Sequence, residues 1–238
     1  MTLPVVLTLV LAESSVELVP NEIATHPAVV SWARRKRKDP RWLILDQNYH
    51  HAAIMRLGRP GAKRGRPDIA HLTLLLALGS PLNMAGQLRC FVHTREDKII
   101  RVDPRTRLPR NTERFVSLLE QLYQEKVVPP TGTPLLTLSD GTLQSLLLEL
   151  NTDFTVALTT EGQMKPLKDV AAKLAQHKRP VVLIGGFSEG HFSKKTLELA
   201  NESYRIHKRR LEAWTVAARA VYDYERALMK GQSEPSLM

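Results

Sequence analysis

The sequence predicts an α/β protein on three observations. The last third alternates short apolar runs with helical segments, as in folds whose helices connect the strands of one sheet. One run, Val181–Ile184, holds three β-branched residues and leads directly into Gly185-Gly186, which is typical of a buried strand that ends in a tight loop. The 238 residues are enough to bury a core around such a sheet. We interpret residues 1–230 as one domain with an insertion at about 58–115.

The composition indicates a nucleic-acid partner and a reducing compartment. The 34 lysines and arginines outnumber 24 acidic residues, for a formal net charge of +10. Such an excess favours a polyanion, nucleic acid above all, although a thermostable surface can also be rich in these residues. The one cysteine, Cys90, excludes a disulfide framework. We expect a soluble, cytoplasmic protein.

The first apolar run, Leu3–Ala12, resembles the core of a signal peptide. No basic side chain precedes it, however, and Glu13 follows immediately, so we interpret it as a buried first strand. Nothing else approaches the roughly eighteen uninterrupted apolar residues of a membrane span. No membrane association is expected.

The next segment predicts two helices around a strand. One helix starts at His26-Pro27, with proline near its first position, and ends in the basic run Arg34–Lys38. The run complements the helix dipole, and contact with RNA is the alternative. Arg41–Asp46 is predicted as a strand, before a helix that carries His50 and His51. Adjacent histidines do not share a helical face and no third ligand stands at a suitable spacing, so no metal site is expected.

A loop dense in glycine, proline and positive charge follows at Gly58–Asp68 and leads into an apolar helix at Ile69–Leu76. Pro67 and Asp68 suit the first turn of that helix. A capped helix start is therefore one interpretation. The other is a rigid basic loop that presents one guanidinium, Arg66, and one carboxylate, Asp68, at a fixed distance.

Strands at Leu88–His93 and Ile99–Val102 are predicted to form a hairpin, and a helix follows over about 111–126. Arginines in this region are spaced three and four apart, so they would line one face if the helical turn begins early. Three arginines on one face repel one another unless an anion lies between them, which favours phosphate binding. These residues are Arg107, Arg110 and Arg114.

The last third predicts the remaining elements in order. A linker at 129–134 precedes a strand near Leu135–Leu138, a helix at Thr142–Leu150, a strand at Phe154–Thr159, a turn at Thr160–Gly162, a helix at Pro166–His177 and the strand at Val181–Ile184. A short helix at about 194–200, a short strand at about 204–207, a final amphipathic helix and a disordered tail at 231–238 complete the chain.

The loop after Val181–Ile184 is a candidate ligand site. Its glycines, Gly185, Gly186 and Gly190, let backbone amides and carbonyls approach a small molecule. The pattern GGxxxG is not the dinucleotide fingerprint, and no GxxxxGK[ST] occurs in the chain. An ordinary strand-to-helix turn is the alternative.

Four motifs together resemble one family. They are KRGRPDIAHLTLL (63–75), VDPRTRLPRNTERF (102–115), LIGGFSEGHFS (183–193) and LEAWTV (211–216). In order and spacing, over nearly the whole chain, they resemble the archaeal and eukaryotic pseudouridine N1-specific rRNA methyltransferases of ribosome biogenesis, in the SPOUT superfamily. The resemblance implies a SPOUT-type α/β knot: a mainly parallel sheet with a C-terminal trefoil knot, and a family-specific inserted hairpin and helix extension. Knots are very rare, so pattern alone would not have suggested one.

The resemblance also implies S-adenosyl-L-methionine as methyl donor and an obligate homodimer. It places the donor on loops at 158–161, 185–190 and 205–211, with the binding residues Leu158, Thr159, Thr160, Gly185, Gly186, Gly190, Arg205, Ile206, His207 and Leu211. The segment 205–210 is more basic than is usual in the family. Backbone contacts would survive that change.

On small-subunit rRNA the resemblance places Lys63, Arg64, Arg66, Asp68, Arg107, Arg110 and Arg114, with Arg66 and Asp68 as the catalytic pair. The N1 of pseudouridine must lose its proton before or during transfer, and Asp68 either accepts it or holds Arg66 in place. The arginines would clamp phosphates around a flipped base. Ribosomal proteins or assembly factors are possible further partners. Two rivals stay open: a SPOUT enzyme that modifies pseudouridine in tRNA, which would lack the three-arginine set, and an RNA-binding assembly chaperone with little or no catalysis.

Overall fold

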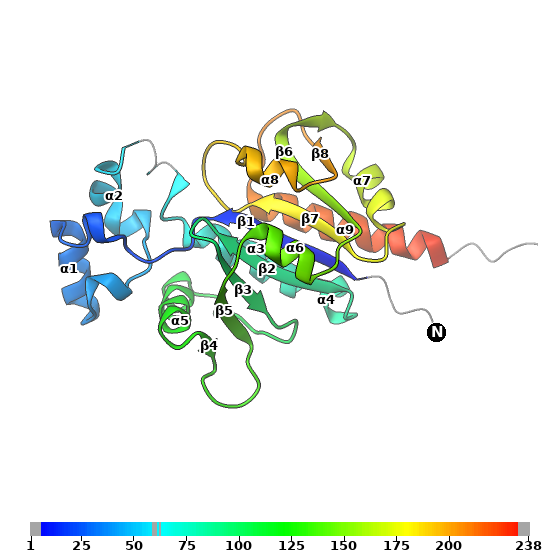
Figure 1. Ribbon diagram of the computed structural model, residues 1–238. Helices are drawn as coiled ribbons and strands as arrows, with labels where there is room; N and C mark the ends of the chain where they lie inside the picture. The colour runs from blue at the N-terminus through cyan, green and yellow to red at the C-terminus, as the bar shows by residue number, and fades with distance from the viewer. Residues whose placement is uncertain (1–5, 59–60, 62, 233–238) are drawn as a thin grey trace, which may run out of the picture.

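The computed structural model describes residues 6–58, 61 and 63–232, and one sheet organises them (Figure 1). Its strand order is β4-β5-β3-β2-β1-β7-β6-β8. The strands are β1 (Leu7–Ser14), β2 (Leu88–Thr94), β3 (Lys98–Val102), β4 (Val127–Val128), β5 (Leu136–Asp140), β6 (Phe154–Met164), β7 (Pro180–Gly185) and β8 (Glu202–Arg205). The strands β2, β1, β7, β6 and β8 run parallel, whereas β3, β5 and β4 extend the sheet through antiparallel pairs. The predicted α/β fold with a mainly parallel sheet is confirmed.

The central strand β1 is buried on both faces. Alternate side chains point to opposite sides, so Leu7, Leu9 and Leu11 join one apolar cluster and Val10 and Ala12 join another. The first cluster includes side chains of α3 (Pro67–Leu78), α7 (Leu167–Leu174) and α9 (Ala213–Gln232); the second includes side chains of α6 (Leu143–Glu149), with α8 (Lys194–Glu198) packed against it. In Figure 1, α6 lies in front of the sheet and α9 behind it. A strand covered on both sides is a continuous apolar run, as predicted for the first strand, whose residues 3–5 lie outside the described part.

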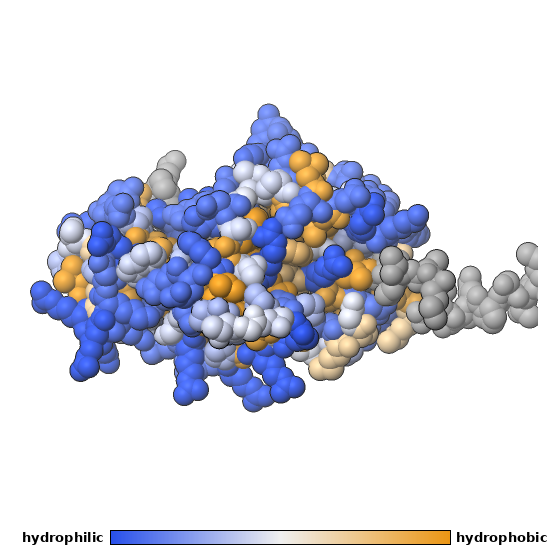
Figure 2. Space-filling view, turned by 60° about the horizontal axis from the view of Figure 1, so that its bottom comes forward, coloured by the Kyte–Doolittle hydropathy of each residue, from blue (hydrophilic) through white to orange (hydrophobic). Residues whose placement is uncertain are grey.

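Residues between β1 and α3 form a small core of their own, separate from the two clusters around the sheet, at the left of Figure 1. It contains α1 (Pro27–Lys36), α2 (Gln47–Met55) and two 3₁₀ helices (Asn21–Ile23 and Pro40–Trp42). Figure 2 shows hydrophilic side chains over this end of the molecule. Two cations of the basic run at the end of α1 attach it to α5 (Thr112–Glu125): Lys36 pairs with Glu113 at 3.3 Å, and Lys38 pairs with Glu120.

The segment 58–115 belongs to the same sheet and core. It supplies α3, α4 (Pro81–Met84) and the predicted hairpin, which is confirmed as the antiparallel pair β2 and β3. Strand β2 pairs in parallel with β1. Whether the segment is an insertion relative to other proteins of this fold stays a prediction, as does the trefoil knot. Residues 59, 60 and 62 of the predicted basic loop lie outside the described part.

Three local predictions are wrong. Arg41–Asp46 is not a strand, because the carboxylate of Asp39 accepts the amide of Arg41 at 2.9 Å and starts a 3₁₀ helix with Pro40. Thr160–Gly162 is not a turn, because β6 continues through it to Met164. The tail does not begin at 231, because α9 continues to 232; residues 233–238 are not described. Among the described helices, none is long and apolar enough to cross a membrane.

Candidate active site

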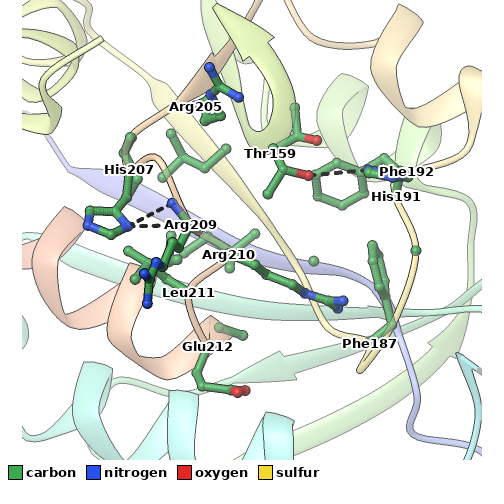
Figure 3. A pocket seen from close by; sticks show the side chains of 18 of the residues that line it. Thr159, Phe187, His191, Phe192, Arg205, His207, Arg209, Arg210, Leu211 and Glu212 are labelled. Atoms are coloured by element: carbon green, nitrogen blue, oxygen red, sulfur yellow. Dashed lines mark hydrogen bonds between the residues drawn. The ribbon is translucent and has the colours of Figure 1, made fainter. Parts of the chain in front are cut away.

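A cavity opens where β7 and β8 end and the pairing of β6 with β8 shifts register (Figure 3). Carboxyl ends of parallel strands meet at one edge of a sheet, where ligands of α/β proteins commonly bind. The space, its open mouth included, is about 760 Å³. All predicted donor-binding residues except Gly186 line it: Leu158, Thr159, Thr160, Gly185, Gly190, Arg205, Ile206, His207 and Leu211.

A bulge in β6 forms one wall. Leu158 and Gln163 both pair with Tyr204 of β8, so the residues between them project from the ladder. A Cβ on Gly162 would lie 2.5 Å from the backbone nitrogen of Tyr204, a distance that only glycine permits. Bulges redirect side chains beside binding sites, and this one brings residues 159 and 160 to the cavity.

The loop after β7 forms the opposite wall. Gly185 lines the cavity, and a Cβ there would lie 2.8 Å from the ring of Phe187. Gly186 was predicted with it but faces β1 instead. Its amide donates to the carbonyl oxygen of Ala12 and its carbonyl oxygen accepts from the amide of Ser15, both at 2.9 Å. Gly186 therefore fastens the loop to the sheet.

The segment after β8 closes the cavity with basic side chains (Figure 3). Arg210 reaches across and donates to the carbonyl oxygen of Ser188 in the β7 loop. The Nδ1 of His207 accepts the amide of Arg209 at 3.1 Å, which stabilises a tight turn. The Nε of Arg205 is buried without a hydrogen-bond partner among the described residues.

The cavity combines an apolar wall with a cationic one. The apolar residues include Ile69, Ile184, Phe187, Phe192 and Val216, and the cations are Arg205, Arg209 and Arg210. The rings of Phe187 and Phe192 meet edge to face, with centroids 5.6 Å apart. Small-molecule sites commonly pair apolar walls with a few polar groups. This arrangement suits a ligand with an aromatic part and an anionic part.

The Arg66–Asp68 pair lies beside this cavity. The Nε and Nη2 of Arg66 donate to the two carboxylate oxygens of Asp68, each at 2.8 Å, and this contact raises the pKa of Arg66. The next residue, Ile69, lines the cavity, and the charge of Glu212, another lining residue, also acts on Arg66. Pro67 begins α3 as predicted. The helix start and the fixed pair are thus both present.

The three predicted phosphate-binding arginines do not share a helical face. Because α5 begins at Thr112, Arg107 and Arg110 lie in the preceding loop and Arg114 alone is helical. All three are exposed, and the described residues offer their guanidinium groups no hydrogen bond or ion pair.

A buried histidine holds that loop against α3. The Nε2 of His71 lies 2.6 Å from the carbonyl oxygen of Pro109, and its ring stacks on Phe115 with centroids 4.5 Å apart. His71 is about one helical turn from Asp68. The loop that carries Arg110 is therefore anchored close to the Arg66–Asp68 pair.

Lys63 and Arg64 both make contacts within the protein, and their contact with RNA stays a prediction. Arg64 donates through Nε at 2.9 Å, and through Nη2, to Oε2 of Glu17. Lys63 donates to the carbonyl oxygen of His191 in the β7 loop. Both cations are engaged within the fold.

His50 is buried and stabilises the start of α2. Its Nδ1 accepts the amide of Asp46 at 3.0 Å, and burial lowers its pKa to about 4. Within the described chain, no three His, Cys, Asp or Glu side chains are placed to hold a metal.

Comparison with known proteins assigns the family. The profile described as EMG1/NEP1 methyltransferase matches residues 9–225. The chain belongs to the EMG1/NEP1 methyltransferase family. It is 44% identical to the ribosomal RNA small subunit methyltransferase Nep1 of Pyrococcus furiosus over 224 residues, an alignment that covers 94% of this chain and 98% of that one. It is 45% identical over 214 residues to the protein of that name from Pyrobaculum neutrophilum, covering 90% and 95%. The structure of Archaeoglobus fulgidus Nep1 bound to S-adenosylhomocysteine matches with a TM-score of 0.82 and 31% identity, over 95% of this chain and 100% of that one.

Sequence reasoning missed several cavity residues of this EMG1/NEP1 family member. They are Ile69, His191, Phe192, Glu212 and Val216. His191 and Phe192 directly follow Gly190, so they would have been included if the predicted ligand loop had been extended by two residues. Glu212 stands inside the motif LEAWTV. Ile69 and Val216 belong to α3 and α9 and meet the loops only in the folded chain.

Proposed function

We propose that this protein transfers a methyl group from S-adenosylmethionine to N1 of a pseudouridine in small-subunit rRNA, in small-subunit ribosome biogenesis. Membership of a methyltransferase family supports the reaction class. The names of the relatives support the RNA, and S-adenosylhomocysteine in the Archaeoglobus fulgidus structure supports the donor. The observation that carries the proposal is the cavity at the strand ends with the Arg66–Asp68 pair beside it.

The cavity residues fit such a donor. The unpartnered Nε of Arg205 would be satisfied by a carboxylate. The apolar wall with Phe187 and Phe192 suits a purine ring, and Gly185 leaves space that a side chain would fill. Bound there, S-adenosylmethionine would supply an electrophilic methyl group on its sulfonium sulfur.

The acceptor nitrogen must lose a proton, and two carboxylates lie near the cavity. Both oxygens of Asp68 already accept hydrogen bonds from Arg66, which favours a positioning role for Asp68 over proton transfer. Glu212 is exposed, lines the cavity and has no hydrogen bond or ion pair among the described side chains. We therefore propose that Asp68 orients Arg66 toward the RNA and that Glu212 is the alternative proton acceptor.

The RNA would lie along the exposed arginines near this pair. Guanidinium groups form paired hydrogen bonds with phosphate, and Arg107, Arg110 and Arg114 have no partner in the described protein. Enzymes that modify a base take it out of the stack. The net charge of +10 supports the same partner.

We also propose a homodimer through the outer face of α3, in a cytoplasmic enzyme. Leu72 and Leu76 lie one turn apart on this helix and are 38% and 47% exposed. Neighbouring exposed apolar side chains commonly mark an interface. Light scattering should give the mass of two chains, and of one chain for Leu72→Lys/Leu76→Lys. A monomeric wild type would refute the dimer.

Calorimetric titration with S-adenosylhomocysteine tests the donor site. Wild type should bind, and Gly185→Val should lose binding because the new side chain meets Phe187. Gly86→Val is the matched control. The φ of +70° at Gly86 strains the backbone of this variant, but its added Cβ meets no atom within 4 Å. Equal losses in both variants would refute the assignment of the cavity.

Methylation of rRNA fragments with pseudouridine or uridine at the target position tests the acceptor. We expect mass spectrometry to find a methyl group on the pseudouridine fragment alone, since N1 of uridine is blocked by the sugar. Arg66→Ala and Asp68→Asn should lower kcat/KM by at least about tenfold, while Glu212→Gln should shift its pH profile if Glu212 takes the proton. Preference for tRNA would support the tRNA alternative. RNA affinity without donor binding would support the chaperone.

A further inference from the structure

We propose that Lys63 and Glu13 are positioning residues that hold the loop 186–193 in the shape that binds the methyl donor. The inference rests on the proposed donor site. It gives Lys63, which lies in the basic loop before α3, a role other than RNA contact. The argument comes from four contacts that reach the loop from outside the cavity.

The ammonium group of Lys63 touches two cavity residues at once. Its Nζ donates to the carbonyl oxygen of His191 and lies 4.4 Å from the ring centroid of Phe187. Both residues line the cavity. A cation over an aromatic face is attracted by the ring, so one side chain fixes both a backbone carbonyl and a cavity ring.

The loop passes close to the side chain of Lys63 at Gly190. A Cβ on Gly190 would lie 2.7 Å from Cε of Lys63, and the φ of Gly190 is +78°. Residues other than glycine rarely adopt that backbone conformation. The backbone conformation therefore favours glycine at the point where the loop meets Lys63.

Glu13 completes the attachment from the end of β1. Its Oε2 lies 3.8 Å from Nζ of Lys63, and its Oε1 accepts the amide of Ser193 at 2.7 Å. The φ of Glu13 is +51°, in the left-handed region that disfavours a glutamate. Strained backbone of this kind persists where the surroundings hold it, commonly at binding sites.

The backbone of Lys63 is held as well. The hydroxyl of Ser15, a buried residue directly after β1, donates to the carbonyl oxygen of Lys63. The ammonium group thus has both an acceptor, His191, and a counter-charge, Glu13, within the protein. These contacts favour an internal role.

Lys63→Met and Glu13→Gln test the proposal, and Lys98→Met is the matched control. The Lys98→Met variant also loses one ion pair, with Asp140 at 2.7 Å, but Lys98 lies on β3 and does not line the cavity. In ligand-free protein, we expect Lys63→Met to speed hydrogen exchange in peptides that cover 186–193, and Glu13→Gln to do so more weakly because an oxygen still faces Ser193. The Kd for S-adenosylhomocysteine should rise about tenfold in Lys63→Met, the size expected for losing a charged hydrogen bond. Lys98→Met should change neither quantity.

The two readouts separate the inference from the function on which it rests. Unchanged exchange and unchanged Kd in Lys63→Met would overturn the inference, as would an RNA salt dependence reduced by one phosphate contact with the donor Kd intact. Failure of wild type to bind S-adenosylhomocysteine would count against the proposed function, while exchange would still decide whether Lys63 holds the loop. Should Lys63→Met fail to fold, Glu13→Gln gives the same comparison.

Discussion

Arg64 is expected to stabilise the fold rather than bind RNA. Its guanidinium pairs with Glu17, whose side chain is 1% exposed and whose Oε1 has no hydrogen-bond partner among the described residues. Arg64→Met keeps the aliphatic stem and leaves this carboxylate buried and unpaired. Glu96 lies close enough for the charge of Glu17, after burial itself, to raise its pKa, so the unpaired carboxylate also faces a like charge.

The cost follows from the burial of the two partners. Removing one member of a buried ion pair costs about 3–5 kcal/mol. Because Arg64 is 14% exposed, we expect the lower end, about 3 kcal/mol in the free energy of unfolding by urea. For a chain of this size, the Tm should fall by about 6–12 °C. Arg64→Met/Glu17→Leu should recover most of the loss, since apolar pairs can replace buried ion pairs.

Arg41→Met is the control for this experiment. Arg41 also donates through Nε and Nη2 to one carboxylate, that of Asp39, but these side chains are 69% and 38% exposed. Its loss should cost less than about 1 kcal/mol. An Arg64→Met protein as stable as Arg41→Met would refute the structural role. A weaker salt dependence of RNA binding in Arg64→Met would identify Arg64 as an RNA contact instead.

Three further predictions concern pH, chemical reactivity and RNA. Because burial lowers the pKa of His50 from 6.5 to about 4, the unfolded chain takes up a proton that the folded one does not. Stability should therefore fall by about 2 kcal/mol from pH 7 to pH 5, and urea titrations of His50→Asn should lack that loss. Burial raises the pKa of Cys90 to about 12, so iodoacetamide should label it only after unfolding. Arg110→Ala should reduce the salt slope of RNA binding by about 1, measured by filter binding, whereas Arg105→Ala, already paired with Asp103, should leave it unchanged.

Elements with local chemical signals were predictable. Pro67 stands at the first position of α3, and the side chain of Asn111 accepts the amide of Arg114 at 3.1 Å to start α5. These contacts join residues a few positions apart. The false strand at Arg41–Asp46 has an apolar run but only an isolated bridge, from Ile44 to Leu18, in the described structure. Strands need neighbours, which local sequence does not specify.

The candidate site also has a part that the sequence predicted and a part that it did not. Its glycine loop was predictable because Gly185 and Gly190 are backbone requirements. What supports that loop was not: the bond between Glu13 and Ser193 joins residues 180 positions apart, and the contact of Lys63 with His191 spans 128. No periodicity in the sequence reports such pairs.

The basic residues show the physical limit most clearly. In the sequence, Lys63, Arg64 and Arg66 are equivalent cations of one loop, and charge counting assigns all of them to RNA. In the fold, all three have partners within the protein: Arg64 pairs with a buried carboxylate, Lys63 lies near Glu13 and donates to a carbonyl oxygen, and Arg66 pairs with Asp68. Counterion release depends on the cations that remain free to meet phosphate. The salt dependence of RNA binding should therefore follow Arg107, Arg110 and Arg114, whose guanidinium groups have no partner among the described residues, and not the net charge of the chain.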